Sequence, residues 1–467
     1  MNDTRIERDT MGEMRVPADA LYGASTQRAV LNFPISGYRF GRPFLRALGL
    51  IKYAAAAVNE QLGRLKPELA GAIRDAAREV ADGRHDEHFV VDVFQTGSGT
   101  STNMNANEVI ATRAGQLLGT AGDERRVHPN DHVNLGQSSN DVIPTAMHVA
   151  LTLMLRDGLR PALSRLQESL RHKAREFDDI IKIGRTHLMD ATPIRLGQEF
   201  SGYARQVAQA DARLAVAGDE LRELPIGGTA VGTGINTHPE FAGRVCAVLA
   251  HEVGVEFQEA TDHFAAQHAK DAVVAFSGAL RGLAVTLTKI ANDIRWLGSG
   301  PRCGLGELRL PATQPGSSIM PGKVNPVIPE AVLQVCAQVM GHDAAVTSAA
   351  ALLGNLDLHT GMPVMTHNLL EAVRLLTNVC GVFVERCLDG LAADRERCET
   401  LVEQSLAMCT SLVPLIGYDR AAELAKEAHR TGRTIRELAL EKKLADPARL
   451  AAALDAAAMT RPQTDQW

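Results

Sequence analysis

The middle of the chain repeats apolar residues at alternating steps of four and three. Between residues 269 and 297 the series is Val273, Phe276, Leu280, Leu283, Leu287, Ile290, Ile294 and Leu297. This spacing places the apolar side chains on one face of a helix. At 1.5 Å per residue, a run of nearly 30 residues predicts a rod of about 40–45 Å. We expect it to end at Gly298, where a glycine commonly follows the last helical turn.

The same spacing recurs elsewhere and predicts a bundle. Four leucines that follow Pro144 keep the 4-3-4 pattern, a third helix is predicted over residues 198–221, and a fourth begins at Glu330. Heptad-like spacing in several long helices favours shallow crossing angles, so the predicted fold class is mainly α with a central long-helix bundle. Such helices expose more apolar surface than one chain covers, which favours symmetric self-association. The four leucines are Leu159, Leu163, Leu166 and Leu170.

The two ends of the chain have different patterns. Residues 1 to about 45 lack sustained periodicity and predict an irregular arm with short strands, and helical patterning begins near Arg46. A helix is predicted over residues 103–118, with caps from residues 100–103, before a polar interruption over residues 119–140. After Gly390 the segments become shorter and more charged. These shifts predict three domains: a mixed, mostly helical domain over 1–138, the bundle over 139–390, and a small helical domain over 391–467.

Composition narrows the class of protein. Hydrophobic residues make up 45% of the 467 positions and aromatic residues only 4%, as in closely packed helices of Ala, Leu and Val. The net charge of −6 disfavours nucleic-acid binding. The apolar runs fall short of the ~20 residues that a membrane span needs, and the polar N-terminus resembles neither a signal nor a transit peptide. Seven cysteines without C-x-x-C spacing predict small buried side chains in a reducing compartment, so we expect a cytoplasmic protein.

Residues 316–326 carry the strongest chemical signal. Their density of Gly and Pro predicts a loop. The loop combines a possible proton acceptor (Ser317 or Ser318), a cation (Lys323) and a neutral amide (Asn325), which are groups that hold a carboxylate while a proton moves beside it. The alternative is a loop that only connects two helices.

Two further segments offer hydrogen-bond donors. Residues 96–103 place hydroxyls and free N–H groups at a helix start, which suits an anion. The P-loop pattern G-x-x-x-x-G-K-[ST] is missing from the sequence, so nucleotide binding by that route is unsupported. Residues 128–141 contain two His and two Asp, but the spacing matches no zinc or calcium pattern, and we predict no metal. This segment is either a polar loop that ends in a helix cap or a carboxylate grip formed by Ser138, Ser139 and Asn140.

A histidine and a glycine-rich stretch complete the candidates. His187 is predicted to lie in a polar loop between long helices, and an imidazole titrates near neutral pH, as proton exchange requires. It needs a carboxylate to fix its tautomer, and Glu330 is the candidate. A lone histidine is more often structural. Residues 227–238 hold four glycines within eight positions, which predicts a tight backbone path for close approach to a ligand or another chain.

These segments together resemble a known family. The motifs TGSGTSTNMNANE, HPND, QSSND, PTAMH, GRTH, GGTAVGTG and GSSIMPGKVNP occur in the order found in class II fumarases of the fumarase/aspartase superfamily. Members of this superfamily add or remove water, ammonia or an amine beside a carboxylate. The resemblance implies a three-domain helical fold and a homotetramer in which three subunits form each active site. It also implies a small dicarboxylate substrate, a place in the tricarboxylic acid cycle, and no cofactor.

The resemblance also assigns roles to matching positions. Ser317 would take the C3 proton, and His187 would deliver a proton to the departing hydroxyl. Glu330, the carboxylate expected to fix the tautomer of His187, completes the catalytic candidates. The substrate would be held by Ser98, Gly99, Thr100, Ser138, Ser139, Asn140, Thr186, Ser318, Lys323, Val324 and Asn325. A second, peripheral anion site would comprise His128, Pro129, Asn130 and Asp131.

The implied reaction is the reversible hydration of fumarate to (S)-malate, by anti addition and elimination of water through an aci-carboxylate. The alternative within the fold is aspartate ammonia-lyase, which residues 21–23, 91–95 with 100–103, and 135–136 favour because they depart from the common fumarase pattern. His187 favours the fumarase, since aspartases typically carry Gln there. A catalytically inactive helical scaffold is the third possibility, and the intact Ser317, His187 and Lys323 speak against it.

Overall fold

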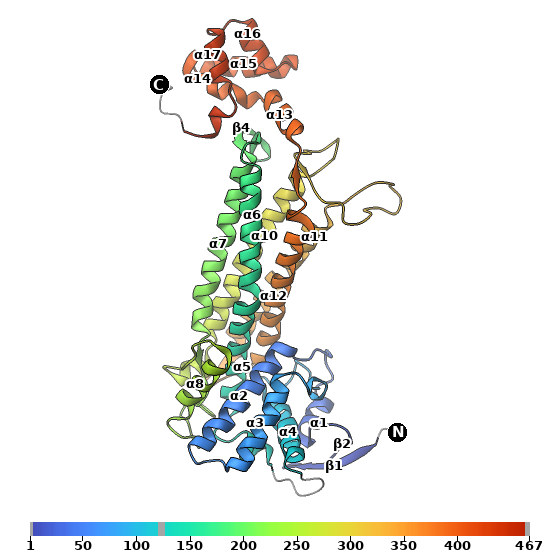
Figure 1. The fold of residues 1–467 in the computed structure, drawn as a ribbon, viewed down its shortest axis with the longest axis vertical. Helices are drawn as coiled ribbons and strands as arrows, with labels where there is room; N and C mark the ends of the chain where they lie inside the picture. Colours follow the sequence, from blue (N-terminus) through green and yellow to red (C-terminus); the bar gives the residue numbers. More distant parts are fainter. Residues whose placement is uncertain (1–2, 120–126, 463–467) are drawn as a thin grey trace. The chain divides into compact units, whose positions relative to one another are not determined.

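The computed structural model describes residues 3–119 and 127–462 and is mainly helical, as predicted (Figure 1). The chain divides into two compact units. Unit 1 comprises Met1–Pro161, Ala212–Ala284 and Ala337–Thr377, and unit 2 comprises Ala162–Asp211, Val285–Cys336 and Asn378–Trp467. The division into three domains stays a prediction.

Unit 1 begins with regular structure where the sequence predicted an irregular arm. Strands β1 (Thr4–Asp9) and β2 (Gly12–Pro17) form an antiparallel hairpin, and helix α1 (Ala24–Asn32) follows. The prediction missed α1 because its N-terminal cap is not local: the carboxylate of Glu108 accepts the N–H of Gly23 at 2.8 Å. The expected short strands are confirmed, and the expected irregularity after them is wrong.

Helices α2 (Arg42–Gln61) and α3 (Pro67–Ala81) lie side by side in unit 1 (Figure 1). They approach so closely that a Cβ added at Gly49 would lie 2.6 Å from the backbone nitrogen of Ala81. Helix α2 starts four residues before the predicted position, with Pro43 in its first turn, where a missing N–H costs no hydrogen bond.

The next two helices of unit 1 begin in different ways. Helix α4 (Thr100–Leu117) starts after Gly99, which has φ = 75° and gives no side-chain cap, so the predicted caps at residues 100–103 are wrong. Helix α5 (Ser139–Met154) is capped by Ser138, which forms a capping box with Asp141, as the loop-to-cap interpretation predicted.

The predicted long helices are confirmed, and each contributes residues to both units. The predicted apolar stripe over 273–297 is buried. Gly298 follows the longest stripe as expected but lacks a positive φ; a Cβ there would lie 2.2 Å from Cδ1 of Leu310, so close packing explains the glycine. The helices are α6 (Arg160–Glu176), α7 (Leu196–Glu220), α10 (Asp271–Leu297), α11 (Val327–Leu353) and α12 (Met362–Phe383).

Shorter elements complete both units. In unit 1 these are β5 (Glu223–Leu224), α8 (Phe241–Val253), β6 (Gln258–Glu259), α9 (His263–His268), β8 (Gly354–Asn355) and β9 (Leu358–His359). In unit 2 they are β3 (Ile181–Thr186), β4 (Met189–Arg195), β7 (Leu308–Arg309), β10 (Ala392–Ala393), α13 (Arg395–Gln404), α14 (Val413–Ile416), α15 (Tyr418–Thr431), α16 (Ile435–Glu441) and α17 (Pro447–Ala453).

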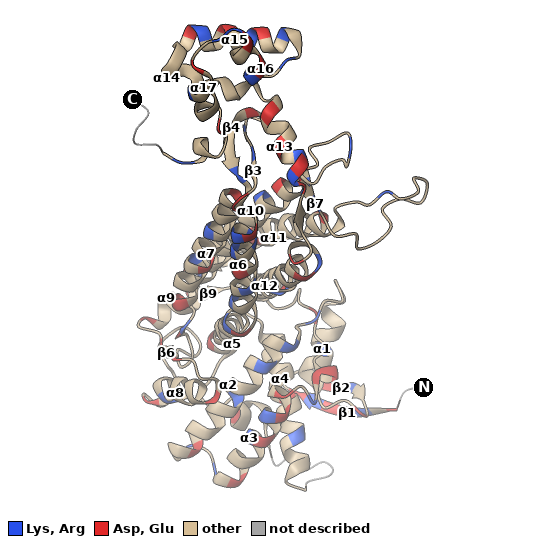
Figure 2. Cartoon of the chain, turned by 45° about the horizontal axis from the view of Figure 1, so that its top comes forward, with Lys and Arg blue, Asp and Glu red and all other residues tan. Residues whose placement is uncertain are grey.

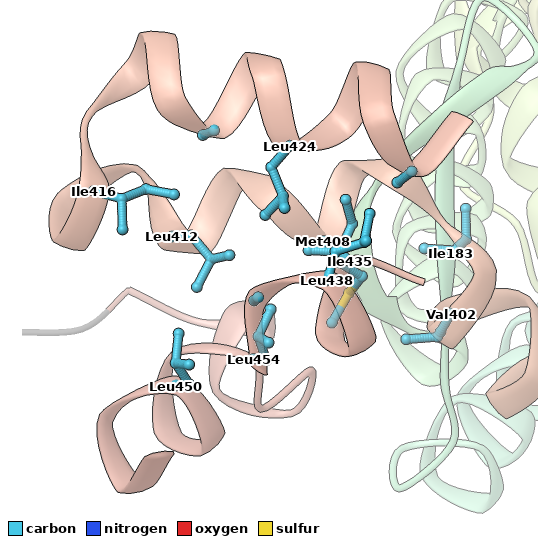
Figure 3. Close-up of a cluster of buried hydrophobic side chains, with 13 residues drawn as sticks. Ile183, Val402, Met408, Leu412, Ile416, Leu424, Ile435, Leu438, Leu450 and Leu454 are labelled. Carbon is cyan, nitrogen blue, oxygen red and sulfur yellow. The ribbon is translucent and has the colours of Figure 1, made fainter. Parts of the chain in front are cut away.

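The predicted C-terminal helices pack around their own apolar cluster in unit 2 (Figure 3). Leu412, Leu424 and Leu438 lie within it, and Ile183 of strand β3 joins from the hairpin. The hairpin β3–β4 is therefore fixed at its base by the hydrophobic core of the C-terminal helices.

Two predictions about composition are corrected in part. The cysteines are all free, but Cys303 is exposed and Cys409 only partly buried, whereas the other five are buried as expected. Helix α10 is long and apolar enough, by length and composition, to span a membrane, so the prediction that the apolar runs are too short is wrong. Of its most apolar 18-residue stretch, 44% is buried inside the protein. Its buried stripe is what a core helix requires. Charges of both signs are interspersed along the chain (Figure 2).

Candidate active site

The loop of residues 316–326, here called the signature loop, lies in unit 2 and has the irregular structure that its sequence predicts, because residues 311–326 contain no helix or strand. The loop closes on itself, because the Gly316 N–H donates to the carbonyl of Lys323 at 2.8 Å and the Asn325 amide donates to the carbonyl of Gly316 at 2.7 Å. A Cβ at Gly316 would lie 2.7 Å from the backbone nitrogen of Asn325. Only glycine permits this closure without a shift of the backbone.

The hydroxyl oxygen of Ser317 accepts hydrogen bonds from within the loop. It accepts the N–H groups of Ile319 at 3.2 Å and Met320 at 3.0 Å. Donors aimed at an oxygen stabilise its negatively charged form more than its neutral form. The arrangement therefore favours loss of the hydroxyl proton.

Lys323 and Ser318 remain accessible to a ligand, whereas the Asn325 amide already closes the loop. Among the residues that the structure describes, the ammonium of Lys323 has no hydrogen bond or ion pair, and it is exposed. Ser318 and Val324 are exposed as well, and Asn325 is half-buried. The cation is thus free to meet an anion rather than being neutralised within unit 2.

His187 lies at the tip of a hairpin, not in the polar loop that the sequence predicted. Thr186 pairs with Met189 across strands β3 and β4, so His187 and Leu188 form a two-residue turn with φ of 58° and 62°. Two consecutive positive φ values are those of a type I′ turn. A leucine in this conformation is uncommon and strained, as residues at functional sites often are.

The predicted partner of His187 is on the first turn of α11. In the part of the chain that the structure describes, His187 and Glu330 form no hydrogen bond with each other, so the orienting role of Glu330 stays a prediction. Both His187 and Thr186 are exposed.

A buried charge cluster holds strand β3 of this hairpin along its length, at Lys182 and at Arg185 beside the turn. Glu307 is fully buried and accepts two hydrogen bonds from Arg185, at 2.8 and 3.1 Å. Lys182 lies 3.5 Å from Glu307 and 3.2 Å from Glu199. Burial raises the pKa of Glu199, and the Lys182 ammonium opposes that rise. The cluster sets the direction in which the hairpin presents its tip.

In unit 1 the structure brings two of the predicted segments together. The Ser98 hydroxyl lies 2.8 Å from that of Thr100, which in turn lies 2.7 Å from the hydroxyl of Ser139. These residues stand at the N-termini of α4 and α5, where free N–H groups favour an anion. The cap of α5 is confirmed, and the carboxylate grip stays a prediction.

The glycine-rich segment 227–238 folds tightly against unit 1 itself. The side chain of Asn140 donates to the carbonyl of Ala230 at 2.7 Å. The carboxylate of Asp141 accepts the N–H groups of Gly227 at 3.0 Å and Thr229 at 2.9 Å. The predicted tight backbone path is confirmed, and its close approach to a ligand or another chain stays a prediction.

One candidate residue was not identified from the sequence, a buried lysine that contacts the segment just before Ser138. Lys52 of α2 is fully buried and donates to the side chains of Asn134 at 3.0 Å and Gln137 at 2.9 Å. The signal was available, because Lys52 is the single charge in the apolar run from residue 47 to residue 58.

The predicted second anion site forms a π-helical turn, Pro129–Val133. Nδ1 of His128 accepts the N–H groups of Asn130 at 3.2 Å and Asp131 at 3.0 Å, so this nitrogen caps the turn. His128, Asn130 and Asp131 are exposed. Their role toward an anion stays a prediction.

One set of His and Glu side chains outside the predicted sites is spaced closely enough to hold a metal ion. In residues 3–119 and 127–462, the closely spaced set is His85, Glu87 and His88. Nε2 of His85 contacts Glu79 at 2.7 Å, and Nδ1 of His88 accepts the N–H of Leu21 at 3.4 Å. An acceptor at Nδ1 places the proton of a neutral His88 on Nε2, toward Glu87 at 3.5 Å. Contacts with other residues of the chain thus explain why these three side chains lie close together.

Comparison with known proteins identifies the family to which the chain belongs. A family model described as lyase matches residues 12–341, and a model of the fumarase C C-terminus matches residues 408–461. The class II fumarate hydratase of Halobacterium salinarum is 55% identical over 98% of this chain and 97% of its own length. The class II fumarate hydratase of Mycobacterium tuberculosis is 54% identical over 94% of this chain and 92% of its own length. The chain belongs to the class II fumarase family.

Solved structures agree with this placement. The class II fumarase of Schistosoma mansoni superposes with a TM-score of 0.96 at 39% identity, covering 99% of this chain and all of that one. The fumarase/aspartase-like fold predicted from the motifs is confirmed, as is membership of the lyases. The match to the lyase model includes the signature loop, the hairpin that carries His187, and both hydroxyl-bearing helix starts of unit 1.

Proposed function

We propose that this protein is a fumarate hydratase that interconverts fumarate and (S)-malate. Family membership over nearly the full length of the chain supports the reaction class, because the similar curated proteins are fumarate hydratases. The observation that carries the assignment of chemistry is the Ser317 oxygen, which receives two N–H donors inside the signature loop.

The reaction follows from these groups. Ser317 removes the C3 proton of malate, and the bond electrons move onto the adjacent carboxylate to give an aci-carboxylate. The Lys323 ammonium stabilises this charge, a contribution of roughly 3 kcal/mol for one well-placed donor. The C2 hydroxyl then leaves as water with a proton from His187. Fumarate remains, and the reverse sequence hydrates it.

The substrate is a small dicarboxylate. One carboxylate is bound by Lys323 and its neighbours in the signature loop of one subunit, and the other by hydroxyls at the starts of α4 and α5 of a different subunit. Supporting this, Ser98, Thr100 and Ser139 form a continuous hydroxyl chain. Residues of the chain suffice for each step as written, so the proposal includes no cofactor.

The assembly is a homotetramer in which three subunits form each active site. Exposed apolar side chains support self-association, since such surface is normally covered. Ile319 of the signature loop is 84% exposed, and Leu356, at the tip of the β8–β9 hairpin, is 91% exposed. We place the enzyme in the cytoplasm and in the tricarboxylic acid cycle.

Replacing Ser317 with Ala tests the proposed base. We expect kcat for malate to fall by about 10²–10⁴-fold, the usual worth of a positioned proton acceptor. The rate is followed by the ultraviolet absorbance of the double bond in fumarate. Ser411→Ala is the matched control, because Ser411 donates only to the carbonyl of Met408 and should keep full activity. An unchanged rate in Ser317→Ala rejects the proposed base.

The mass in solution tests the assembly. Light scattering should give about four times the 50.1 kDa of the chain. A fully active monomer would contradict the shared active site.

A further inference from the structure

Lys52 is a buried cation whose charge no carboxylate contacts. Its side chain is fully buried in α2, and within the described residues no carboxylate oxygen lies within ion-pair distance of it. Transfer of an ammonium from water to a protein interior is costly unless hydrogen bonds compensate. Burial accordingly lowers the pKa of Lys52 to about 7. The free-energy cost of burying this ammonium indicates that Lys52 has a role beyond packing.

The two acceptors of Lys52 lie in one turn, residues 134–138, which leads into α5. Because Oδ1 of Asn134 and Oε1 of Gln137 face the ammonium, their NH₂ groups must point the other way. The Asn134 amide donates to the carbonyl of Gln137 at 3.0 Å. The Gln137 amide donates to the carbonyls of Val133 at 3.1 Å and Leu135 at 3.2 Å. Lys52 thus fixes the amide orientations that hold the backbone of the turn.

Asp141 holds the other end of the same turn. Its Oδ1 accepts the N–H of Ser138 at 2.9 Å, and its Oδ2 accepts N–H groups of the glycine-rich loop at Gly227 and Thr229. Asp141 is fully buried, and burial raises its pKa to about 6. The turn therefore lies between two buried groups of opposite charge, and Ser138, Ser139 and Asn140 follow directly from it.

We propose that Lys52 is a positioning residue for substrate binding, which acts through Asn134 and Gln137 on the turn that presents residues 138–140. It does not touch the substrate. The proposal rests on the proposed function, in which those residues bind one carboxylate of the dicarboxylate.

The test is to replace Lys52 with Met, which keeps the volume of the side chain and removes its donors. We expect KM for fumarate to rise by about tenfold with kcat nearly unchanged, the pattern of lost binding rather than lost chemistry. Lys173→Met is the matched control. Lys173 is also a buried lysine, but it donates to Glu176 and to the carbonyl of Leu391 in unit 2. This control should lose thermal stability and keep its KM.

Each outcome decides the proposal. A KM that stays within twofold of the wild type in a folded Lys52→Met variant shows a purely structural lysine and overturns the proposal. If that variant does not fold, Gln137→Leu removes one acceptor of the ammonium without burying a new charge and should raise KM in the same way; an unchanged KM there also overturns it. If the wild type does not interconvert fumarate and malate, the proposed function fails, and this inference falls with it.

Discussion

Replacing Glu307 with Gln should destabilise the hairpin that carries His187. The substitution keeps the shape of the side chain but removes the fully buried negative charge between Arg185 and Lys182. Removing one partner of a buried ion pair leaves the other charge without compensation, at a cost of about 3–5 kcal/mol. Lys182 retains Glu199 at 3.2 Å, and Arg185 is 15% exposed. Both facts reduce the penalty, so we expect the lower end, about 3 kcal/mol.

The assay is urea unfolding followed by far-ultraviolet circular dichroism. The matched control is Glu240→Gln, which removes the partner of Arg244 in a solvent-exposed helical pair. An exposed pair contributes little to stability because solvent screens it, so the two variants should differ several-fold. Because this cluster holds strand β3 beside the turn, kcat of Glu307→Gln should also fall. A loss of stability no larger than that of the control would refute the role assigned to this cluster.

Three further predictions concern other residues of the chain. Replacing the exposed His187 with Asn should lower kcat for malate by about 10²-fold or more without changing the unfolding midpoint, and a normal kcat would exclude it as the proton donor. Burial lowers the pKa of His148 to about 4, so as pH falls below about 6.5 the unfolded chain binds a proton that the folded chain does not, and stability decreases. His148→Gln should remove about 3 kcal/mol of that acid-induced loss in urea midpoints compared at neutral and acidic pH, and an unchanged slope would contradict this. Gly97→Ala should impair folding and soluble yield, because its Cβ would lie 2.0 Å from the carbonyl oxygen of Thr360, and a normal melting temperature would show that the loop can shift.

The sequence predicted the long helices because their signal is local and periodic. The apolar stripe over 273–297 needs only its own spacing to be recognised, and the helix found, α10, ends at Leu297, one residue before the predicted Gly298. Helix α1 could not be found in this way, since its cap is Glu108, more than 80 residues away in sequence. The start of α4 was misplaced because Gly99 begins it by its backbone conformation, not by a capping side chain.

The candidate site shows the same division between local and long-range information. The closed signature loop follows from its Gly and Pro content, and Ser317 was identifiable there because a hydroxyl, a cation and an amide occur together. The hairpin under His187 was missed because its two-residue turn, His187-Leu188, lacks the glycine that usually marks such a turn. Lys52 was missed because its partners, Asn134 and Gln137, become neighbours only when α2 packs against the turn before α5.

The most direct test of the central claim offers malate and aspartate separately to the purified protein without added cofactor. The account predicts fumarate from malate and no ammonia from aspartate, because His187 is present to protonate a departing hydroxyl. Ammonia from aspartate together with inert malate would contradict it and assign the chain to the ammonia-lyases of the same fold.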